Sequence, residues 1–128
     1  MTDFNTANNR AVWFDIPVVD LDRAARFYTA VIGVDVQKEQ FGDISFCILD
    51  HKDGNGGCLI VDPNAVSADH GVLVYLNVDG RIRDALDQVK KLGGKMIEDI
   101  KSLGQYGFRA LVLDSEGNRI ALHSNSDA

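Results

Sequence analysis

The chain has 128 residues, of which 45% are hydrophobic and 25% are charged, a size and balance typical of one ordinary globular domain. Asp and Glu outnumber Lys and Arg by 19 to 13, and the net charge of −6 argues against nucleic acid as a partner, because its phosphate backbone requires concentrated positive charge. No apolar stretch reaches the ~20 residues that cross a bilayer, so we expect no membrane insertion.

The two cysteines, Cys47 and Cys58, each lie within an apolar run. Two isolated cysteines do not make a disulfide framework, so a reducing cytoplasm is the expected location. Residues 1–10 are polar and lack the apolar segment of a secretory signal. We therefore interpret residues 1–10 and 125–128 as tails.

The first half of the chain predicts one helix among short strands. Residues 12–19 alternate in polarity, which places Trp13 and Asp15 on one face of a strand and the more apolar residues on the other. Asp20 is a candidate N-cap, apolar residues follow at helical spacing, and Gly33 stands where a left-handed C-cap belongs. Further strands are expected at residues 34–38, 44–49 and 57–61.

The second half repeats this plan. An apolar run at residues 72–78 predicts a strand, Asp79 is a candidate N-cap, and a helical stripe over residues 82–92 ends at Gly93. Further strands are expected at residues 95–100, 107–113 and 119–123. The matching landmarks lie about 60 residues apart, which indicates an internal duplication.

In each half, a Gly-Asn pair joins the last two predicted strands, at residues 54–55 and 117–118. Gly and Asn tolerate the positive φ that tight hairpins require. Both halves thus have the order strand, helix, strand, strand, strand. We predict an α+β fold of two βαβββ modules, residues 11–61 and 71–124, within a single domain spanning residues 11–124.

The chain resembles the vicinal-oxygen-chelate superfamily, which includes glyoxalase I, bleomycin-resistance proteins and extradiol dioxygenases. The resemblance rests on the segment from Phe14 to Ala24, on Phe27, Tyr28 and Gly33 after it, and on residues 113–122. It implies mixed sheets that curve into a cup, with the helices outside and the ligand site inside. It also implies a homodimer, since the cups of this family commonly pair.

The resemblance further implies where a divalent metal would bind. In metal-dependent members, His, Glu or Gln on the first and last strands of each module hold the ion. The matching positions here hold Trp13, Cys58, Val72 and Ala121. Trp and aliphatic side chains coordinate no metal, and a lone cysteine is usually a small buried hydrophobe. We predict no cofactor and no usual metal site, while a divalent metal held by other residues stays open.

Two polar residues share faces with these positions. Strand alternation places Asp15 on the side of Trp13 and His123 on the side of Ala121. A carboxylate and an imidazole that both point into the cup could perform acid–base chemistry, or bind a metal weakly with a third donor. The alternative for His123 is a partly exposed residue at a strand end. Burying Asp15 is costly without a partner.

Other candidates lie in loops. Tyr106 and Phe108 stand in a glycine-containing segment beside a predicted strand, where they line either the ligand mouth or the core. His70 ends the connector between modules and could reach inward only after a shift in register. His51 lies among charged residues and indicates a solvated turn. Phe27 and Tyr28 are expected to pack the first helix on its sheet.

The sequence favours a metal-free protein that binds a small organic molecule. The candidate pocket residues are Trp13, Asp15, Cys58, Val72, Val74, Tyr106, Phe108, Ala121 and His123. The alternative is a divergent lyase or isomerase of the glyoxalase type that uses Asp15 and His123. A third hypothesis is a non-catalytic module that dimerises through its sheet edges. The fold class cannot name the ligand, because one scaffold hosts unrelated chemistries.

Overall fold

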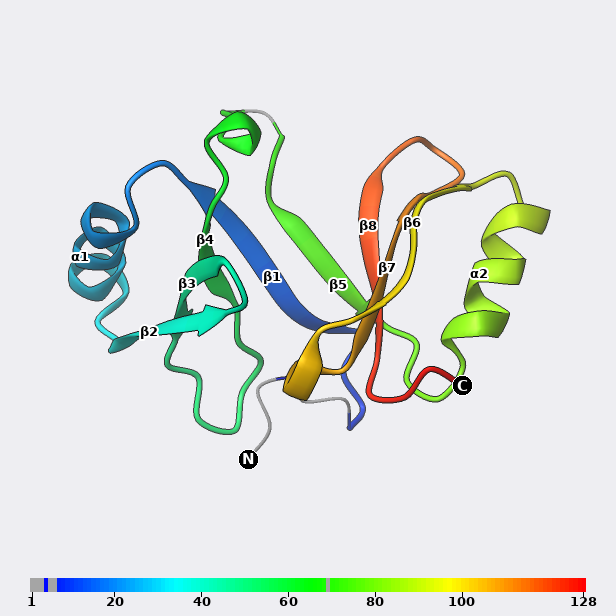
Figure 1. Cartoon of the computed structure of the whole chain (residues 1–128), viewed down its shortest axis with the longest axis horizontal. Coiled ribbons are helices and arrows are strands. Elements are labelled where there is room, and N and C mark those ends of the chain that lie inside the picture. Colours follow the sequence, from blue (N-terminus) through cyan, green and yellow to red (C-terminus); the bar gives the residue numbers. More distant parts are fainter. Residues whose placement is uncertain (1–3, 5–6, 69) are drawn as a thin grey trace. The chain divides into compact units, whose positions relative to one another are not determined.

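The computed structural model describes residues 4, 7–68 and 70–128, which form two compact units with the same order of elements (Figure 1). The first unit, module 1, begins at Trp13 and ends at Val72. The second, module 2, runs from Leu73 to Ala128 and includes the described residues before Trp13.

Module 1 is a four-stranded mixed sheet with one helix against one face. Its elements are β1 (Ala11–Val18), α1 (Leu21–Ile32), β2 (Val36–Phe41), β3 (Ile44–Leu49) and β4 (Cys58–Val61), followed by a short 3-10 helix, η1 (Pro63–Ala65). The strand order is β2-β3-β4-β1, in which β4 and β1 are parallel and the other neighbours are antiparallel. The helix packs through residues such as Ala24 and Tyr28 onto Leu59 and Cys47 of the sheet.

The caps of α1 are those that the sequence predicts. Asp20 has extended backbone angles, and its side chain accepts a hydrogen bond of 3.0 Å from the Arg23 N–H. Gly33 adopts the left-handed conformation with φ of 77°, and its N–H donates to the Thr29 carbonyl. Tyr28 packs on the sheet as expected, whereas Phe27 is 56% exposed. The expectation for Phe27 was wrong because it lies on the solvent side of the helix.

Module 2 repeats the architecture. Its elements are β5 (Leu73–Asn77), α2 (Ile82–Lys91), β6 (Lys95–Ser102), β7 (Phe108–Leu113) and β8 (Arg119–Ser124), with a 3-10 helix, η2 (Gly104–Tyr106), between β6 and β7. The strand order is β5-β8-β7-β6, and β5 and β8 are parallel. The helix buries Ile82, Ala85 and Leu86 against Val112 and Leu122.

Asp79 does not cap α2, and this prediction was wrong. The N-cap is Arg81, which makes no capping side-chain hydrogen bond. A capping side chain must directly precede the first helical residue, and Gly80 and Arg81 separate Asp79 from it. The Asp79 carboxylate instead accepts hydrogen bonds from the Asn125 N–H at 2.7 Å and from the Ser124 hydroxyl at 3.4 Å. It therefore ties the segment after β8 to the segment after β5.

The two Gly-Asn turns differ. Between β7 and β8, Gly117 has φ of 91°, as predicted, and the Asp114 side chain accepts from the Asn118 N–H at 2.8 Å. Between β3 and β4 the positive φ belongs to Lys52, with φ of 50°, and not to Gly54. This loop is longer than a tight hairpin, so the prediction for the first turn was wrong.

The α+β class and the two βαβββ modules are confirmed, and the boundaries differ by a few residues, as in β2, which begins at Val36 and not at residue 34. The enclosing cup stays a prediction. Within residues 4, 7–68 and 70–128, the helices are all too short or too polar to cross a membrane.

Candidate functional site

The face of module 1 that turns away from α1 carries three of the predicted residues. Phe14 and Ile16 of β1 pack toward the helix, so strand alternation turns Trp13 and Asp15 to the other side. Asp15 pairs with Cys58 in the parallel register of β1 and β4. The Cys58 thiol donates a hydrogen bond to the Asp15 carboxylate, with 3.2 Å between Sγ and Oδ1. Asp15 is only 8% exposed, and this thiol is one of its partners.

Trp13 is buried, and its indole meets the imidazole of His51 edge to face, with ring centroids 6.2 Å apart. The His51 Nδ1 lies within hydrogen-bond distance of the carbonyls of Lys52 and Gly54. A side chain at position 56 would collide with the imidazole, so glycine is required there. His51 lies beside the turn at residues 52–53, and its ring is half-buried because it contacts the loop backbone and Trp13.

In module 2, His123 is fully buried, with 0% exposure. Its Nε2 lies 2.6 Å from the Tyr106 carbonyl oxygen. Because a carbonyl only accepts, Nε2 carries the proton and Nδ1 is the unprotonated nitrogen. Nδ1 is buried and has no hydrogen-bond partner among the residues that the structure describes. The alternative of a partly exposed His123 is therefore wrong.

Burial lowers the pKa of His123, and the hydrogen bond with Tyr106 and the charge of Asp79 offset this only in part. The imidazole is thus held neutral near pH 7. A neutral imidazole with one free ring nitrogen is an acceptor of a hydrogen bond or a proton. Nδ1 accepts no hydrogen bond from the described residues, and its burial without one costs desolvation free energy.

Gly107 allows the Tyr106 carbonyl to reach this imidazole. Its φ is 92°, which favours glycine. A Cβ at this position would lie 2.6 Å from the Ser124 carbonyl oxygen and 3.1 Å from the His123 Nε2. The absence of a side chain therefore lets η2 lie directly on β8.

Phe4 covers the imidazole on one side. The two rings are stacked, with centroids 4.0 Å apart and planes inclined by 5°. The Phe4 ring also meets Tyr75 at 5.8 Å and Tyr106 at 6.4 Å, both at tilted angles. Phe4 is 6% exposed, although the polar composition of residues 1–10 suggests a tail. We call the place that Phe4 occupies among His123, Tyr75 and Tyr106 the aromatic slot.

A polar group adjoins the slot. Arg109 Nη1 donates a hydrogen bond of 2.6 Å to the Tyr75 hydroxyl, and Arg109 Nη2 lies 3.6 Å from Glu98 Oε1. The guanidinium also lies 5.8 Å from the Tyr75 ring centroid. The Glu98 carboxylate partly neutralises the positive charge of Arg109. Arg109 and Tyr75 escaped the sequence prediction, although Arg109 pairs with His123 in the β7–β8 register and so shares its face.

The other predicted residues are dispersed. Ala121 is buried and pairs with Tyr75, so it lies on the slot side of the sheet. Val74 precedes Tyr75 on β5 and lies on the opposite side. Phe108 alternates with Arg109 and therefore lies on the other side of the sheet from the slot. Val72 is 57% exposed at the end of module 1.

The connector histidine has a local partner. His70 Nδ1 lies 3.1 Å from the Ser67 hydroxyl oxygen, and the His70 N–H also donates to that oxygen at 3.2 Å. The side chain is exposed. These contacts hold His70 in the turn of the connector.

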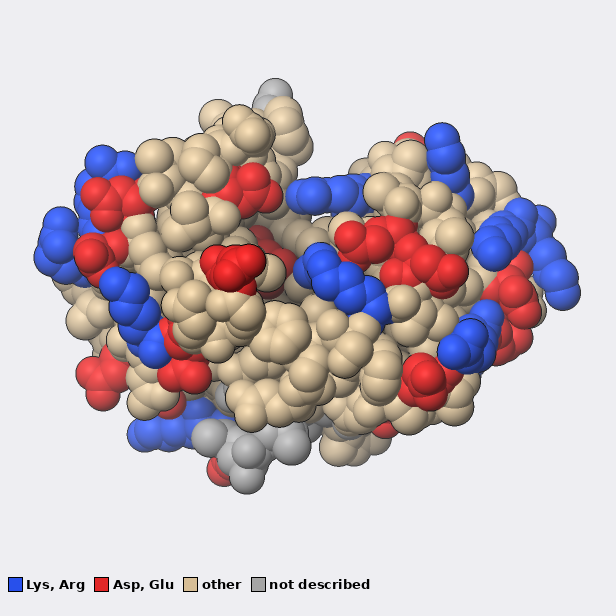
Figure 2. Space-filling model, in the orientation of Figure 1, with Lys and Arg blue, Asp and Glu red and all other residues tan. Residues whose placement is uncertain are grey.

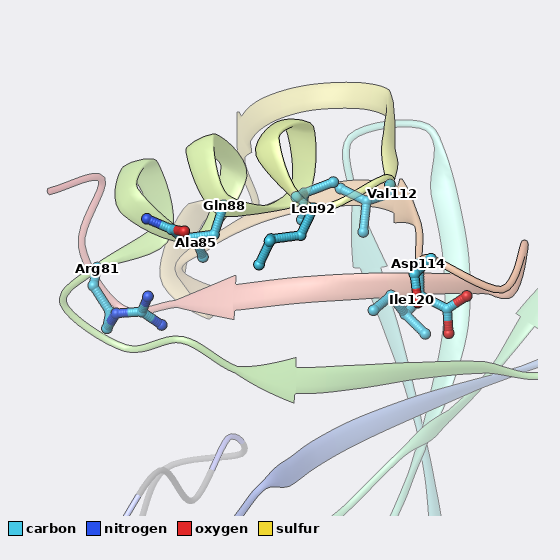
Figure 3. A pocket seen from close by; sticks show the side chains of 10 residues that line it. Arg81, Ala85, Gln88, Leu92, Val112, Asp114 and Ile120 are labelled. Atoms are coloured by element: carbon cyan, nitrogen blue, oxygen red, sulfur yellow. The ribbon is translucent and has the colours of Figure 1, made fainter.

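Each module has a surface cavity on the helix side of its sheet. The first, about 330 Å³, lies between α2 and the β7–β8 hairpin, with Arg81 at one end and Asp114 at the other (Figure 3). The second, about 320 Å³, lies beside α1 and is lined by residues that include Phe27 and Val66. None of the nine predicted pocket residues lines either cavity.

The side chains at the family's metal positions do not fit a divalent metal. Trp13 and Ala121 are buried without a donor atom suited to an ion, Val72 is aliphatic, and the Cys58 thiol donates a hydrogen bond to Asp15. Among the described residues, no group of three His, Cys, Asp or Glu side chains is arranged to hold an ion.

Surface charges are mixed rather than concentrated. On the face shown in Figure 2, Lys and Arg side chains lie singly or beside Asp and Glu. Exposed ion pairs include Lys38 with Asp22 at 3.1 Å and Arg81 with Asp84 at 2.6 Å. Such pairs contribute little to stability. On this face, the charges form no large basic area.

Comparison with known proteins identifies the family. Residues 10–122 match the model of the Glyoxalase/Bleomycin resistance protein/Dioxygenase superfamily. A glyoxylase-like domain-containing protein from Didymella fabae is 31% identical over 115 residues, which cover 84% of this chain and 88% of that protein. The chain belongs to the glyoxalase/bleomycin resistance protein/dioxygenase superfamily, and the resemblance is confirmed.

Solved structures show the same fold. A hypothetical protein, BH1468, from Bacillus halodurans has a TM-score of 0.72 at 14% identity, with 94% of this chain and 97% of that chain covered. A methylmalonyl-CoA epimerase variant from Streptomyces coelicolor, in complex with 2-nitronate-propionyl-CoA, has a TM-score of 0.67 at 22% identity, with 94% and 99% covered. At these identities the likeness concerns the fold alone.

Proposed function

We propose that this protein binds a small organic molecule on the face of module 2 that turns away from α2. The observation that carries the proposal is the Tyr75–Arg109 hydrogen bond of 2.6 Å beside the buried His123. Ligand sites commonly combine aromatic walls with a few fixed polar groups. This face has that combination, and the Glu98 carboxylate near Arg109 favours a partly apolar ligand over a strong anion.

Ligand binding can be tested with a metabolite panel, by thermal shift followed by calorimetric titration. The Tyr75→Phe variant removes one hydroxyl and leaves the ring, so we expect the dissociation constant of a ligand to rise about tenfold, the equivalent of one hydrogen bond. Tyr28→Phe, on α1 of module 1, is the matched control and should bind as the unmutated chain does. If no compound binds, or if Tyr75→Phe binds equally well, this assignment is wrong.

We further propose that binding needs no divalent metal. The chemistry of Trp13, Cys58, Val72 and Ala121 supports this, because these side chains offer only one thiol, which is engaged with Asp15. Metal analysis of protein purified without chelators tests it. We expect less than stoichiometric metal, and unchanged ligand affinity after EDTA treatment. Stoichiometric, tightly held Zn, Ni, Mn or Fe would overturn this reading.

A divergent lyase or isomerase of the glyoxalase type is the second candidate. It is favoured by the neutral state of His123 and its unprotonated Nδ1, since such a nitrogen can accept a proton. Asp15 would act as a second acid or base. If turnover of a ligand is found, His123→Gln should reduce kcat by at least about a hundredfold. Unchanged turnover would show that His123 takes no part in the reaction.

We also propose that the protein forms homodimers in the cytoplasm, as the family resemblance implies. Exposed apolar side chains on α1, Phe27, Val31 and Ile32, support an association surface. Sedimentation velocity at micromolar concentration should give the dimer mass, and Val31→Glu should shift it to that of a monomer. A monomer at all concentrations would contradict this.

A further inference from the structure

Phe4 is buried, but it lies outside the hydrophobic cluster that packs against α2. The core cluster lies on the α2 side of the sheet and is formed by residues such as Ile82, Val112 and Leu122, and Phe4 is not a member. Phe4 lies on the other side, stacked on His123. Its ring therefore covers His123 on the side of the sheet that turns away from α2.

Two residues of the aromatic slot, His123 and Tyr75, are held by contacts in which Phe4 takes no part. His123 is oriented by its hydrogen bond with the Tyr106 carbonyl, and Tyr75 is oriented by the hydrogen bond from Arg109. The close approach of Gly107 to β8 supports the first of these contacts. Because neither contact involves Phe4, we expect His123 and Tyr75 to keep their orientation when the phenyl ring leaves. Such preorganisation favours binding.

The slot has the geometry of a site for a flat ring. The His123 imidazole forms its floor, parallel to the Phe4 ring within 5°. Tyr75 and Tyr106 form inclined walls, at 54° and 57° to the Phe4 plane. Planar rings gain from such stacked and tilted contacts beyond simple burial. Burial lowers the pKa of His123 and keeps the imidazole neutral. A neutral imidazole offers no charge to attract, so an uncharged ligand ring suits it.

We propose that the aromatic slot is a subsite for a planar, uncharged aromatic ring of the ligand, and that Phe4 is a tethered occupant which this ring displaces. This inference rests on the proposed function, because it places the ligand on the same face of module 2. The phenyl side chain of Phe4 is itself an example of the chemical class that the slot accepts.

The tether decides how strongly Phe4 competes. The same segment is held to β5 at Asn9, whose carbonyl accepts a hydrogen bond of 2.9 Å from Asn77 Nδ2. A ring on so short a tether has an effective concentration of about millimolar or higher. The apparent affinity for an external ring is reduced by the fraction of molecules in which the slot is filled. Removal of the Phe4 ring should therefore raise that affinity.

The test is titration of the full-length protein with indole, a planar uncharged ring, against the Phe4→Ala variant. We expect indole to bind Phe4→Ala about tenfold or more tightly than the unmutated chain. Phe41→Ala removes a half-buried phenyl group at the end of β2 in module 1 and is the matched control, with the affinity of the unmutated chain. Cyclohexanol, which has a ring of similar size but no aromatic face, should show no such difference.

NMR locates the bound ring. The stacked Phe4 ring should move the His123 ring protons upfield, Phe4→Ala should remove this shift, and indole should restore it. In the unmutated chain labelled at phenylalanine, saturating indole should move the Phe4 signals toward those of an exposed ring. This second measurement needs no substitution, so it decides the question even if Phe4→Ala folds poorly.

The inference is overturned if indole binds both chains with equal affinity, or leaves the His123 and Phe4 signals unchanged. Failure of the proposed function has a different signature. If Tyr75→Phe weakens the affinity for panel ligands and Phe4→Ala leaves it unchanged, the proposed function is supported and the displacement of Phe4 is wrong. If indole enters the slot of Phe4→Ala while no panel ligand binds the unmutated chain, the slot is a site for an aromatic ring and the proposed ligand-binding function is wrong.

Discussion

The Cys58 thiol and the Asp15 carboxylate are joined by a hydrogen bond of 3.2 Å across the parallel pair of β4 and β1. Both residues are buried on the side of the sheet opposite α1. A buried carboxylate needs donors to replace the water that it loses. This relationship gives a reason for a cysteine at position 58 in place of an aliphatic residue of similar size.

Loss of this thiol should therefore destabilise module 1. We expect Cys58→Ala to lower the free energy of unfolding by about 1–3 kcal/mol, because one donor to a buried acceptor is lost and a small cavity is left. Cys58→Ser keeps a donor and should cost less. Urea denaturation at pH 7 measures both variants. Equal stability of Cys58→Ala and the unmutated chain would show that the hydrogen bond contributes nothing.

Cys47 should be chemically inert in the folded protein. It is buried in the cluster beneath α1, and this burial raises the pKa of its thiol. The reactive species is the thiolate, so labelling by iodoacetamide at pH 7 should proceed only as fast as the protein opens. Mass spectrometry of labelled peptides, with and without urea, measures this rate. Rapid, complete labelling of Cys47 without urea would contradict the prediction.

Replacement of Asp79 should loosen the end of β8 and spare the start of α2. Asp79→Ala removes the acceptor for the Asn125 N–H, with an expected loss of about 1 kcal/mol for one hydrogen bond. Hydrogen exchange at Asn125 should accelerate. Asp20→Ala is the comparison, because there the exchange should accelerate at Arg23, in the first turn of α1. Faster exchange throughout the first turn of α2 in Asp79→Ala would show that Asp79 caps this helix after all.

Acid should destabilise the protein through His123. Burial lowers the pKa of this imidazole in the folded state, so the unfolded state binds a proton more readily. The stabilisation is fully present above the ordinary histidine pKa of about 6.5 and is lost as the pH falls toward the lower folded-state value. Urea denaturation at several pH values from 7.5 to 5 should show this decline.

The His123→Gln variant supplies the control for this pH dependence. Glutamine can donate to the Tyr106 carbonyl and does not titrate, so the decline in stability should be smaller in this variant. His70→Gln, in the exposed connector, should keep the decline of the unmutated chain. An equal decline in all three chains would assign the effect to other groups.

The elements could be predicted from the sequence because they depend on local patterns. Alternation along β1 separates Asp15 from Phe14, and the spacing from Asp20 to Gly33 defines α1 with both of its caps. The failure at Asp79 is also local, since Gly80 and Arg81 extend the turn by two residues before α2. Periodicity does not reveal such an extension when a capping residue stands near the expected place.

The site was less accessible to sequence reasoning because its contacts join distant segments. The burial of His123 depends on Phe4, and its tautomer depends on the carbonyl of Tyr106. The Tyr75–Arg109 hydrogen bond requires the β5-β8-β7 strand order. Side-chain type marks His123 as a candidate, but only strand pairing brings Arg109 beside it.

Gly107 has a consequence for the position of one hydrogen atom. Any β-carbon at this point would press on the Ser124 carbonyl and on the imidazole, and would lift η2 away from the strand. The His123 ring would then lose the hydrogen-bond acceptor that fixes the proton on Nε2. Which edge of the ring is basic is thus decided by a residue that has no functional group of its own.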